Sequence, residues 1–243
     1  MLFSNPFFLP PMFLGHFGVG FGAKTLQPRV SLGTLFLAAQ LADLVWPTLL
    51  LLGVERVRIV PHFTATNAFD FVYYPFTHSL LGELIAGLLL GVGYWVLRRD
   101  RRGALLVGLL VPSHWLLDVL VHIPDLPLYP GASPRLGLGL WDHFALTQVL
   151  EFGLLAAGLW LYAQRTQART KVGRYGLLGL VAFLVLLHVG SLLSPPPASV
   201  DALGWSGQLF WLTVLLAYWV DRNRDVTGSP SGETRPGSGP SIS

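Results

Sequence analysis

The sequence predicts an all-α fold, a polytopic transmembrane helical bundle of six or seven spans. Three observations support this prediction. The 243 residues are 52% hydrophobic and only 12% charged, whereas soluble domains carry roughly 25% charged residues. The mean hydropathy is +0.56. Apolar runs close to the roughly 20 residues that cross a bilayer recur along the chain, with basic residues between them.

The chain divides into one membrane domain and a tail. Residues 1–226 contain all the apolar runs, and we expect them to form a single transmembrane helical domain. Residues 227–243 are rich in Gly, Ser and Pro, which is typical of a disordered polar tail. The net charge of +3 is concentrated in loops, so it reports orientation, and no nucleic-acid partner is expected. The absence of cysteine excludes disulfides and thiolate metal ligands.

The apolar runs predict the spans in chain order. The first run is short and forms either a retained first helix or a partly inserted one, since it lacks the basic start of a signal peptide. Its glycines from Gly15 to Gly22 are spaced as on a close helix-packing face. The connection 55–74 carries aromatic side chains suited to the headgroup boundary. The expected spans are 6–23, 31–54, 75–97, 103–122, 142–163, 175–194 and 203–220.

Basic residues between the runs predict the orientation. Arg98 to Arg102 follow the third run, Arg165 to Arg174 follow the fifth, and Arg222 follows the last. Cytoplasmic loops are enriched in Lys and Arg, so these ends and the C-terminus are expected on the cytoplasmic side of the inner membrane. Arg56 and Arg58, on the opposite side, run against this trend.

The second half of the fourth apolar run contains ionisable residues. His114, Asp118 and His122 fall at positions i, i+4 and i+8, so they project from one face of a helix. An Asp at the bilayer centre costs on the order of 3 kcal/mol. This face therefore needs a partner such as a proton, a cation or a metal.

Other segments bring similar residues to the same depth. In the expected topology, His16 and Asp43 lie near the middle of the membrane, and His78 lies at the outer end of its helix. We expect these residues to meet the His114 face in the outer half of the membrane. Glu83 would lie deeper. The mouth of the cavity would be lined by Asp125, Asp142 and His143.

Four short motifs carry a resemblance to a known family. They are Gly15-His16, Ala42-Asp43-Leu44, Phe76-Thr77-His78-Ser79-Leu80 and Ser113-His114-Trp115-Leu116-Leu117-Asp118. Over roughly residues 14–130 the chain resembles the bacterial membrane-bound metal-dependent hydrolases of the YdjM-like family. The resemblance implies a hydrolase, with metal ligands at His16, Asp43, His78, His114 and Asp118.

Imidazole and carboxylate ligands suit a divalent metal, with zinc expected first and manganese or iron as alternatives. Bound water then has a pKa near 7 and can attack an ester or phosphoester. Glu83 or Asp125 is the candidate catalytic residue, acting as the proton shuttle. The expected partners are membrane lipids, and the expected substrate is a lipid-like or periplasmic small molecule.

Other interpretations stay open. His114 and Asp118 could form a hydrogen-bonded pair between helices, and His78 could cap its helix beside Thr77. His122 and Asp125 are expected to be rim or turn residues near the interface. The whole protein could be a small proton- or ion-coupled transporter, although we find no inverted repeat and no matching broken segments in its two halves. It could also be a non-enzymatic membrane scaffold.

Overall fold

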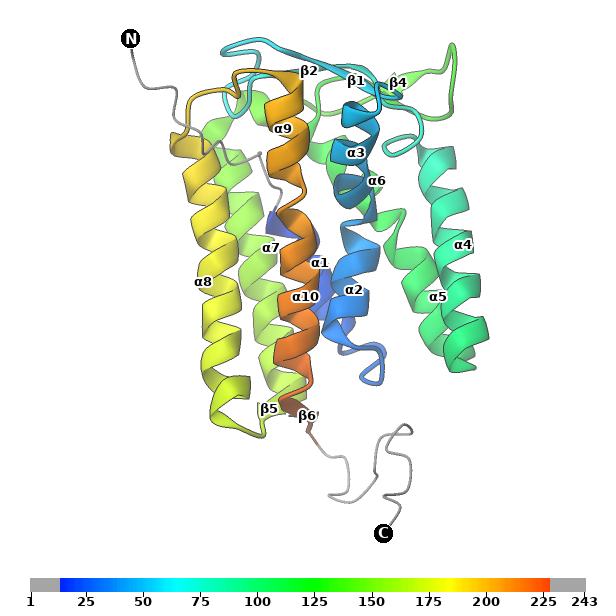
Figure 1. Ribbon diagram of the computed structural model, residues 1–243, viewed down its shortest axis with the longest axis vertical. Helices are drawn as coiled ribbons and strands as arrows, with labels where there is room; N and C mark the ends of the chain where they lie inside the picture. Colours follow the sequence, from blue (N-terminus) through cyan, green and yellow to red (C-terminus); the bar gives the residue numbers. More distant parts are fainter. Residues whose placement is uncertain (1–13, 228–243) are drawn as a thin grey trace.

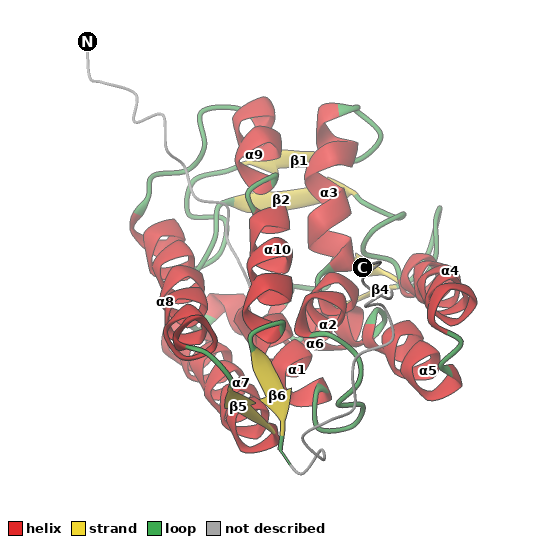
Figure 2. Ribbon diagram, turned by 60° about the horizontal axis from the view of Figure 1, so that its bottom comes forward, coloured by secondary structure: helices red, strands yellow, loops and turns green. Residues whose placement is uncertain are grey.

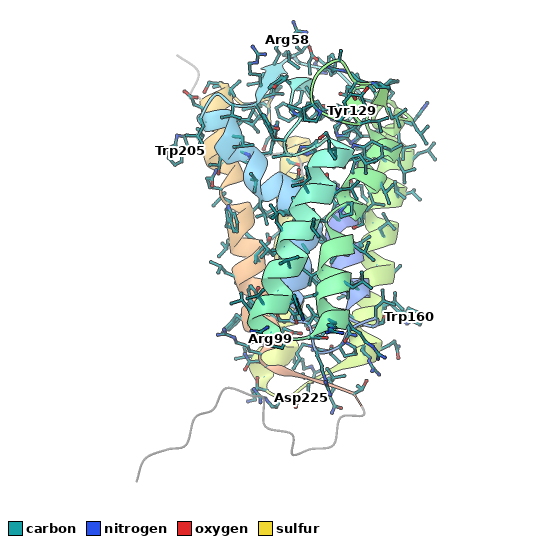
Figure 3. All side chains as sticks on the ribbon, turned by 90° about the vertical axis from the view of Figure 1, so that its right-hand side faces the viewer. Arg58, Arg99, Tyr129, Trp160, Trp205 and Asp225 are labelled. Atoms are coloured by element: carbon teal, nitrogen blue, oxygen red, sulfur yellow. The ribbon has the colours of Figure 1, made fainter. Side chains whose placement is uncertain are left out.

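The computed structural model describes residues 14–227 (Figure 1). The chain is mostly helical, with long helices side by side, the β1–β2 and β3–β4 hairpins at one end and β5–β6 at the other. The predicted polar tail, apart from Thr227, and the beginning of the first predicted span lie outside the described residues. We call the two ends of the bundle the hairpin end and the basic end. Arg58 marks the hairpin end and Arg99 the basic end in Figure 3.

The helices are α1 Leu14–Ala23, α2 Leu32–Ala39, α3 Leu41–Leu51, α4 Leu80–Arg98, α5 Arg101–Leu110, α6 Ser113–Val121, α7 Phe144–Arg165, α8 Lys171–Leu193, α9 Val200–Gly207 and α10 Phe210–Asp221, with a 3-10 turn at Leu140–Asp142. The strands are β1 Arg56–Ile59, β2 Phe69–Tyr73, β3 Leu126–Pro127, β4 Arg135–Leu136, β5 Thr166–Ala168 and β6 Arg224–Val226. The all-α expectation omitted these strands, because strands of two to five residues leave little periodicity to recognise.

Within residues 14–227, five stretches are long and apolar enough to cross a membrane, or six if the bent pair α2 and α3 is one span. Two of the five combine two helices each, α5 with α6 and α9 with α10. The helix α1 has ten residues, a rise of about 15 Å, which is half of the roughly 30 Å hydrocarbon core. The described part of the first predicted span is therefore too short to cross alone.

The short helix α1 lies inside the bundle. Its side chains are buried on several faces, with Leu14, Phe17 and Phe21 at 1% exposure or less. A side chain at Gly18 would overlap the backbone of α7, and one at Gly158 would overlap Gly18. The expected close-packing face of glycines is confirmed at this contact. Figure 2 shows α1 between α7 and the α2–α6 pair, with α4 and α5 on the far side.

Helices that break or begin inside the bundle leave backbone groups without helical partners. The α2–α3 break lies at Gln40, with a bend of 56°, a broken segment that sequence reasoning did not identify. Two buried carboxylates satisfy such groups. Glu151 Oε2 accepts a hydrogen bond from Gly15 N at 3.3 Å, and Glu83 Oε2 accepts one from Trp115 N at 3.1 Å. Each glutamate thus caps the first turn of a neighbouring helix.

A charged cluster holds the basic end together. Lys24 Nζ lies 2.8 Å from Asp221 Oδ2 and donates to Val30 O at 2.9 Å. The same aspartate accepts hydrogen bonds from Tyr162 Oη at 3.0 Å and Leu32 N at 3.1 Å. We call these five residues the Lys24 cluster; it joins the loop between α1 and α2 to α2, α7 and α10.

Candidate metal centre

Four parts of the chain contribute side chains to one cluster, at the level where α2 ends and α3 and α6 begin. All its members are buried except Asp43, whose side chain is 20% exposed. His16 lies in the first turn of α1, and Asp43 lies in the first turn of α3. His78 comes immediately before the N-cap of α4, and α6 supplies the remaining two residues. We call His16, Asp43, His78, His114 and Asp118 the His/Asp cluster. The structure thus brings together all five residues that the family resemblance implied.

The donor atoms form two overlapping groups of three that share His114. One comprises His16, His114 and Asp118, and the other Asp43, His78 and His114, with donor atoms within 4.8 Å of one another in each. The two oxygens of Asp118 serve different neighbours. Oδ1 lies 3.1 Å from His16 Nε2, and Oδ2 lies 3.3 Å from His114 Nε2. Asp43 Oδ1 lies 3.4 Å from His78 Nε2 and 3.7 Å from His114 Nε2.

The tautomer of His114 follows from a backbone contact. Its Nδ1 lies 3.0 Å from Ala39 O, a carbonyl at the end of α2 where the helix breaks. A carbonyl only accepts, so Nδ1 carries the proton. In the neutral ring the lone pair is then on Nε2, which faces the carboxylates and has no hydrogen bond among the described residues.

His78 is oriented in the same sense by a chain of hydrogen bonds. Thr77 Oγ1 donates its single proton to Glu55 Oε2 at 2.6 Å, so it accepts from His78 Nδ1 at 2.7 Å. Glu55 Oε1 also accepts from the backbone N–H groups of Phe76 and Thr77, at 2.8 and 3.0 Å. The lone pair of His78 therefore lies on Nε2, toward Asp43. Such an outer layer of hydrogen bonds is typical of metal-ligating histidines.

With these tautomers, the Nε2 lone pairs of His78 and His114 face carboxylate oxygens, which are also acceptors. A cation or an added proton between them would remove this repulsion. Two ligand atoms about 2.0–2.2 Å from one tetrahedral zinc ion lie roughly 3.3–3.6 Å apart. Three of the four contacts of His78 and His114 with the carboxylates span 3.3 to 3.7 Å, and the fourth, between His78 Nε2 and Asp118 Oδ2, is 4.0 Å. Direct charge-assisted hydrogen bonds are shorter, at about 2.7–2.9 Å. The spacing and the nitrogen and oxygen donors fit a divalent metal ion, and the buried group could hold one.

The two candidate proton shuttles lie next to the cluster. Glu83 is buried, and its Oε1 has no hydrogen-bond partner among residues 14–227 while Oε2 caps α6. Asp125 Oδ1 lies 2.9 Å from His122 Nδ1, and the other nitrogen of that ring lies 3.9 Å from Asp118 Oδ2. Asp125 is thus separated from the cluster by an imidazole, whereas Glu83 keeps an oxygen available.

The expected rim residues divide into two classes. His122 caps the end of α6 and Asp125 lies in the turn that follows, as expected, but they are only 3% and 8% exposed, so protein and not water surrounds them. The ring of Trp141 covers His122 with centroids 4.0 Å apart, and Tyr74 also packs against it. Burial, followed by the nearby Asp125 carboxylate, raises the pKa of Tyr74 well above its usual value. Asp142 and His143 are exposed.

Sequence reasoning missed Glu55 and the role of Ala39. Glu55 is 1% exposed although it lies in the connection expected to be partly interfacial. Its spacing from His78 follows no helical or strand period, and only the hydroxyl of Thr77 beside that histidine hinted at a second layer. Comparison with protein-family models, curated proteins and solved structures gives no match for this chain. The geometry of the cluster is therefore the basis for assigning function.

Proposed function

We propose that this protein is a metal-dependent hydrolase of the inner membrane, with a divalent ion, zinc in the first instance, held by the His/Asp cluster. One observation carries the proposal. The hydrogen bonds at Nδ1 of His78 and His114 leave the Nε2 atoms as acceptors. These two atoms converge with two carboxylates at metal-ligand spacing inside an apolar bundle. The motif resemblance to the YdjM-like hydrolases supports the same reading.

The chain's own residues divide the work. The residues that would hold the ion are His78, His114, Asp43 and Asp118. His16 would orient Asp118 through its contact with Oδ1 of that carboxylate. When bound, the ion supplies Lewis acidity and lowers the pKa of a water toward 7. Glu83, through its available oxygen, would accept and return a proton, and Asp125 is the second candidate for that role.

The proposed orientation places the hairpin end outside and the basic end in the cytoplasm. Among the described residues, only Arg56, Arg58 and Arg135 of the basic side chains lie near the hairpins. If α2 and α3 form one span, the described part of the chain would cross six times and α10 would end on the cytoplasmic side. A cluster nearer the outer face suits an ester or phosphoester of a lipid-like or periplasmic compound.

The first experiment is elemental analysis of the detergent-purified protein. We expect near-stoichiometric metal in the wild type and its loss in both His114→Ala and Asp118→Ala. His188→Ala is the matched control, because His188 is equally buried but pairs with Gln148 on α7. Size-exclusion elution and helical circular dichroism establish matched folding. A well-folded wild type that binds no zinc, manganese or iron after reconstitution would refute the proposal.

One observation favours a second candidate, a proton- or ion-coupled transporter. Discontinuous helices line the ion sites of many transporters, and the α2–α3 break lies beside the cluster. Flux across vesicles reconstituted with the wild type separates the two functions. Ion-dependent flux without hydrolysis of lipid or phosphoester substrates would favour the transporter. Absence of metal, flux and hydrolysis would leave the scaffold interpretation.

A further inference from the structure

An apolar groove runs along the outside of α8 and α10 near the basic end. Its volume is about 610 Å³, within the range of roughly 300–1,000 Å³ found for small-molecule sites. Lys171 lies at its lining together with Tyr175, Gly179 and Trp219. It is remote from the His/Asp cluster, which lies on other helices.

Missing side chains on α8 create the groove. A Cβ placed at Gly179 would meet nothing within 4 Å, so this part of the helix leaves open space. A Cβ at Gly176, one turn before Gly179 on α8, would approach the ring of Trp219 to 3.1 Å. At that level α10 therefore packs closely against α8 and forms a wall of the groove. Tyr175 and Trp219 are exposed aromatic residues of the kind found at headgroup level.

The charge at this end of the groove is positive. Lys171 is exposed and, among residues 14–227, forms no ion pair. Asp221, the nearest acidic residue on α10, is turned inward to Lys24. Arg174, on the next turn of α8, lies over the Tyr175 ring at 5.8 Å. Asp225 on β6 is the exposed carboxylate of this region.

We propose that this groove binds an anionic phospholipid, with an acyl chain along Gly179 and the phosphate at Lys171. A basic side chain at the end of an apolar cleft between transmembrane helices is the arrangement that recognises anionic headgroups. A zwitterionic lipid offers the same chain but sets an ammonium beside the lysine. This site is independent of the proposed hydrolase activity.

The test is lipid retention by the full chain, measured by native mass spectrometry from detergent with equal phosphatidylglycerol and phosphatidylcholine. We expect the wild type to retain phosphatidylglycerol about fivefold better, the effect of one basic residue near a headgroup. Lys171→Gln should remove that preference. Arg101→Gln is the matched control, because Arg101 is also the exposed first residue of a helix at the basic end.

A second pair of variants tests the chain site. Gly179→Leu fills the groove and should reduce retention of both lipids, while Gly153→Leu, at an exposed glycine of α7 with nothing within 4 Å, should not. Equal retention of the two lipids by the wild type would overturn the proposal. So would unchanged selectivity in Lys171→Gln, or displacement of the lipid by inorganic phosphate. If Gly179→Leu fails to fold, the comparison of Lys171→Gln with Arg101→Gln still tests the proposal.

Discussion

The Lys24 cluster and the His/Asp cluster are both polar groups inside an apolar bundle, but only the first is complete. Asp221 receives donors on both oxygens, from Lys24, Leu32 and Tyr162. In the His/Asp cluster, the acceptor Nε2 atoms of His78 and His114 face carboxylate oxygens at 3.3 to 4.0 Å. Buried polar groups are costly unless paired. The first cluster therefore stabilises the fold by itself, whereas the second could take up a proton or a cation.

The largest expected effect is on stability at the Lys24 cluster. Asp221→Ala removes the carboxylate that pairs with the buried Lys24 ammonium, and breaking a buried ion pair costs about 3–5 kcal/mol. We expect a clearly lower midpoint of thermal unfolding in detergent, with metal per folded chain unchanged. Asp225→Ala, at an exposed site on β6, is the control. Equal midpoints in the two variants would contradict the assigned role of the Lys24 cluster.

Glu83→Gln separates capping from proton transfer. The amide oxygen still accepts from Trp115 N, so fold and metal content should stay unchanged. The amide cannot take up a proton, and hydrolysis should fall by about 10²–10⁴-fold if Glu83 is the shuttle. The measurement is the turnover of an active substrate at matched metal content. Full activity in Glu83→Gln would transfer the role to Asp125 or to solvent.

Removal of the ion by a chelator should destabilise the wild type. A ligand present at 100 times its dissociation constant stabilises the folded state by about 2.7 kcal/mol. We therefore expect a lower unfolding midpoint after chelation, restored by added zinc. Asp118→Ala should show no response, because it lacks the shared carboxylate. A chelator effect of equal size in that variant would place the ion elsewhere.

The smallest expected effect is at the second layer. Thr77→Val removes the hydroxyl between Glu55 and His78, and loss of such a partner typically weakens metal binding 10- to 100-fold. Thr77→Ser keeps the hydroxyl and should keep the affinity. Competition with a chromogenic chelator measures both. Equal metal affinity in the two variants would show that the hydrogen bonds from Glu55 through Thr77 do not orient His78.

Local pattern accounts for part of this molecule. The spacing of four put His114 and Asp118 on one face of a helix, and the structure has both donor atoms converging there. The glycine spacing on α1 anticipated its close contact with α7. The sequence did not predict the burial of His122. Its position along the span indicates only how deep it lies in the membrane, and the loop that carries Trp141 folds over it.

Composition and periodicity alone determined that the chain is a helical membrane protein, where its apolar segments lie, and which polar residues interrupt them. These are properties of neighbours in sequence, which share a helix face or a bilayer depth. Only the tertiary structure decided the pairing of Lys24 with Asp221, 197 residues apart, the break at Gln40, and the fixing of His114 and His78 as acceptors. Such contacts depend on how helices pack, because a donor and its acceptor from distant segments leave no period in the sequence.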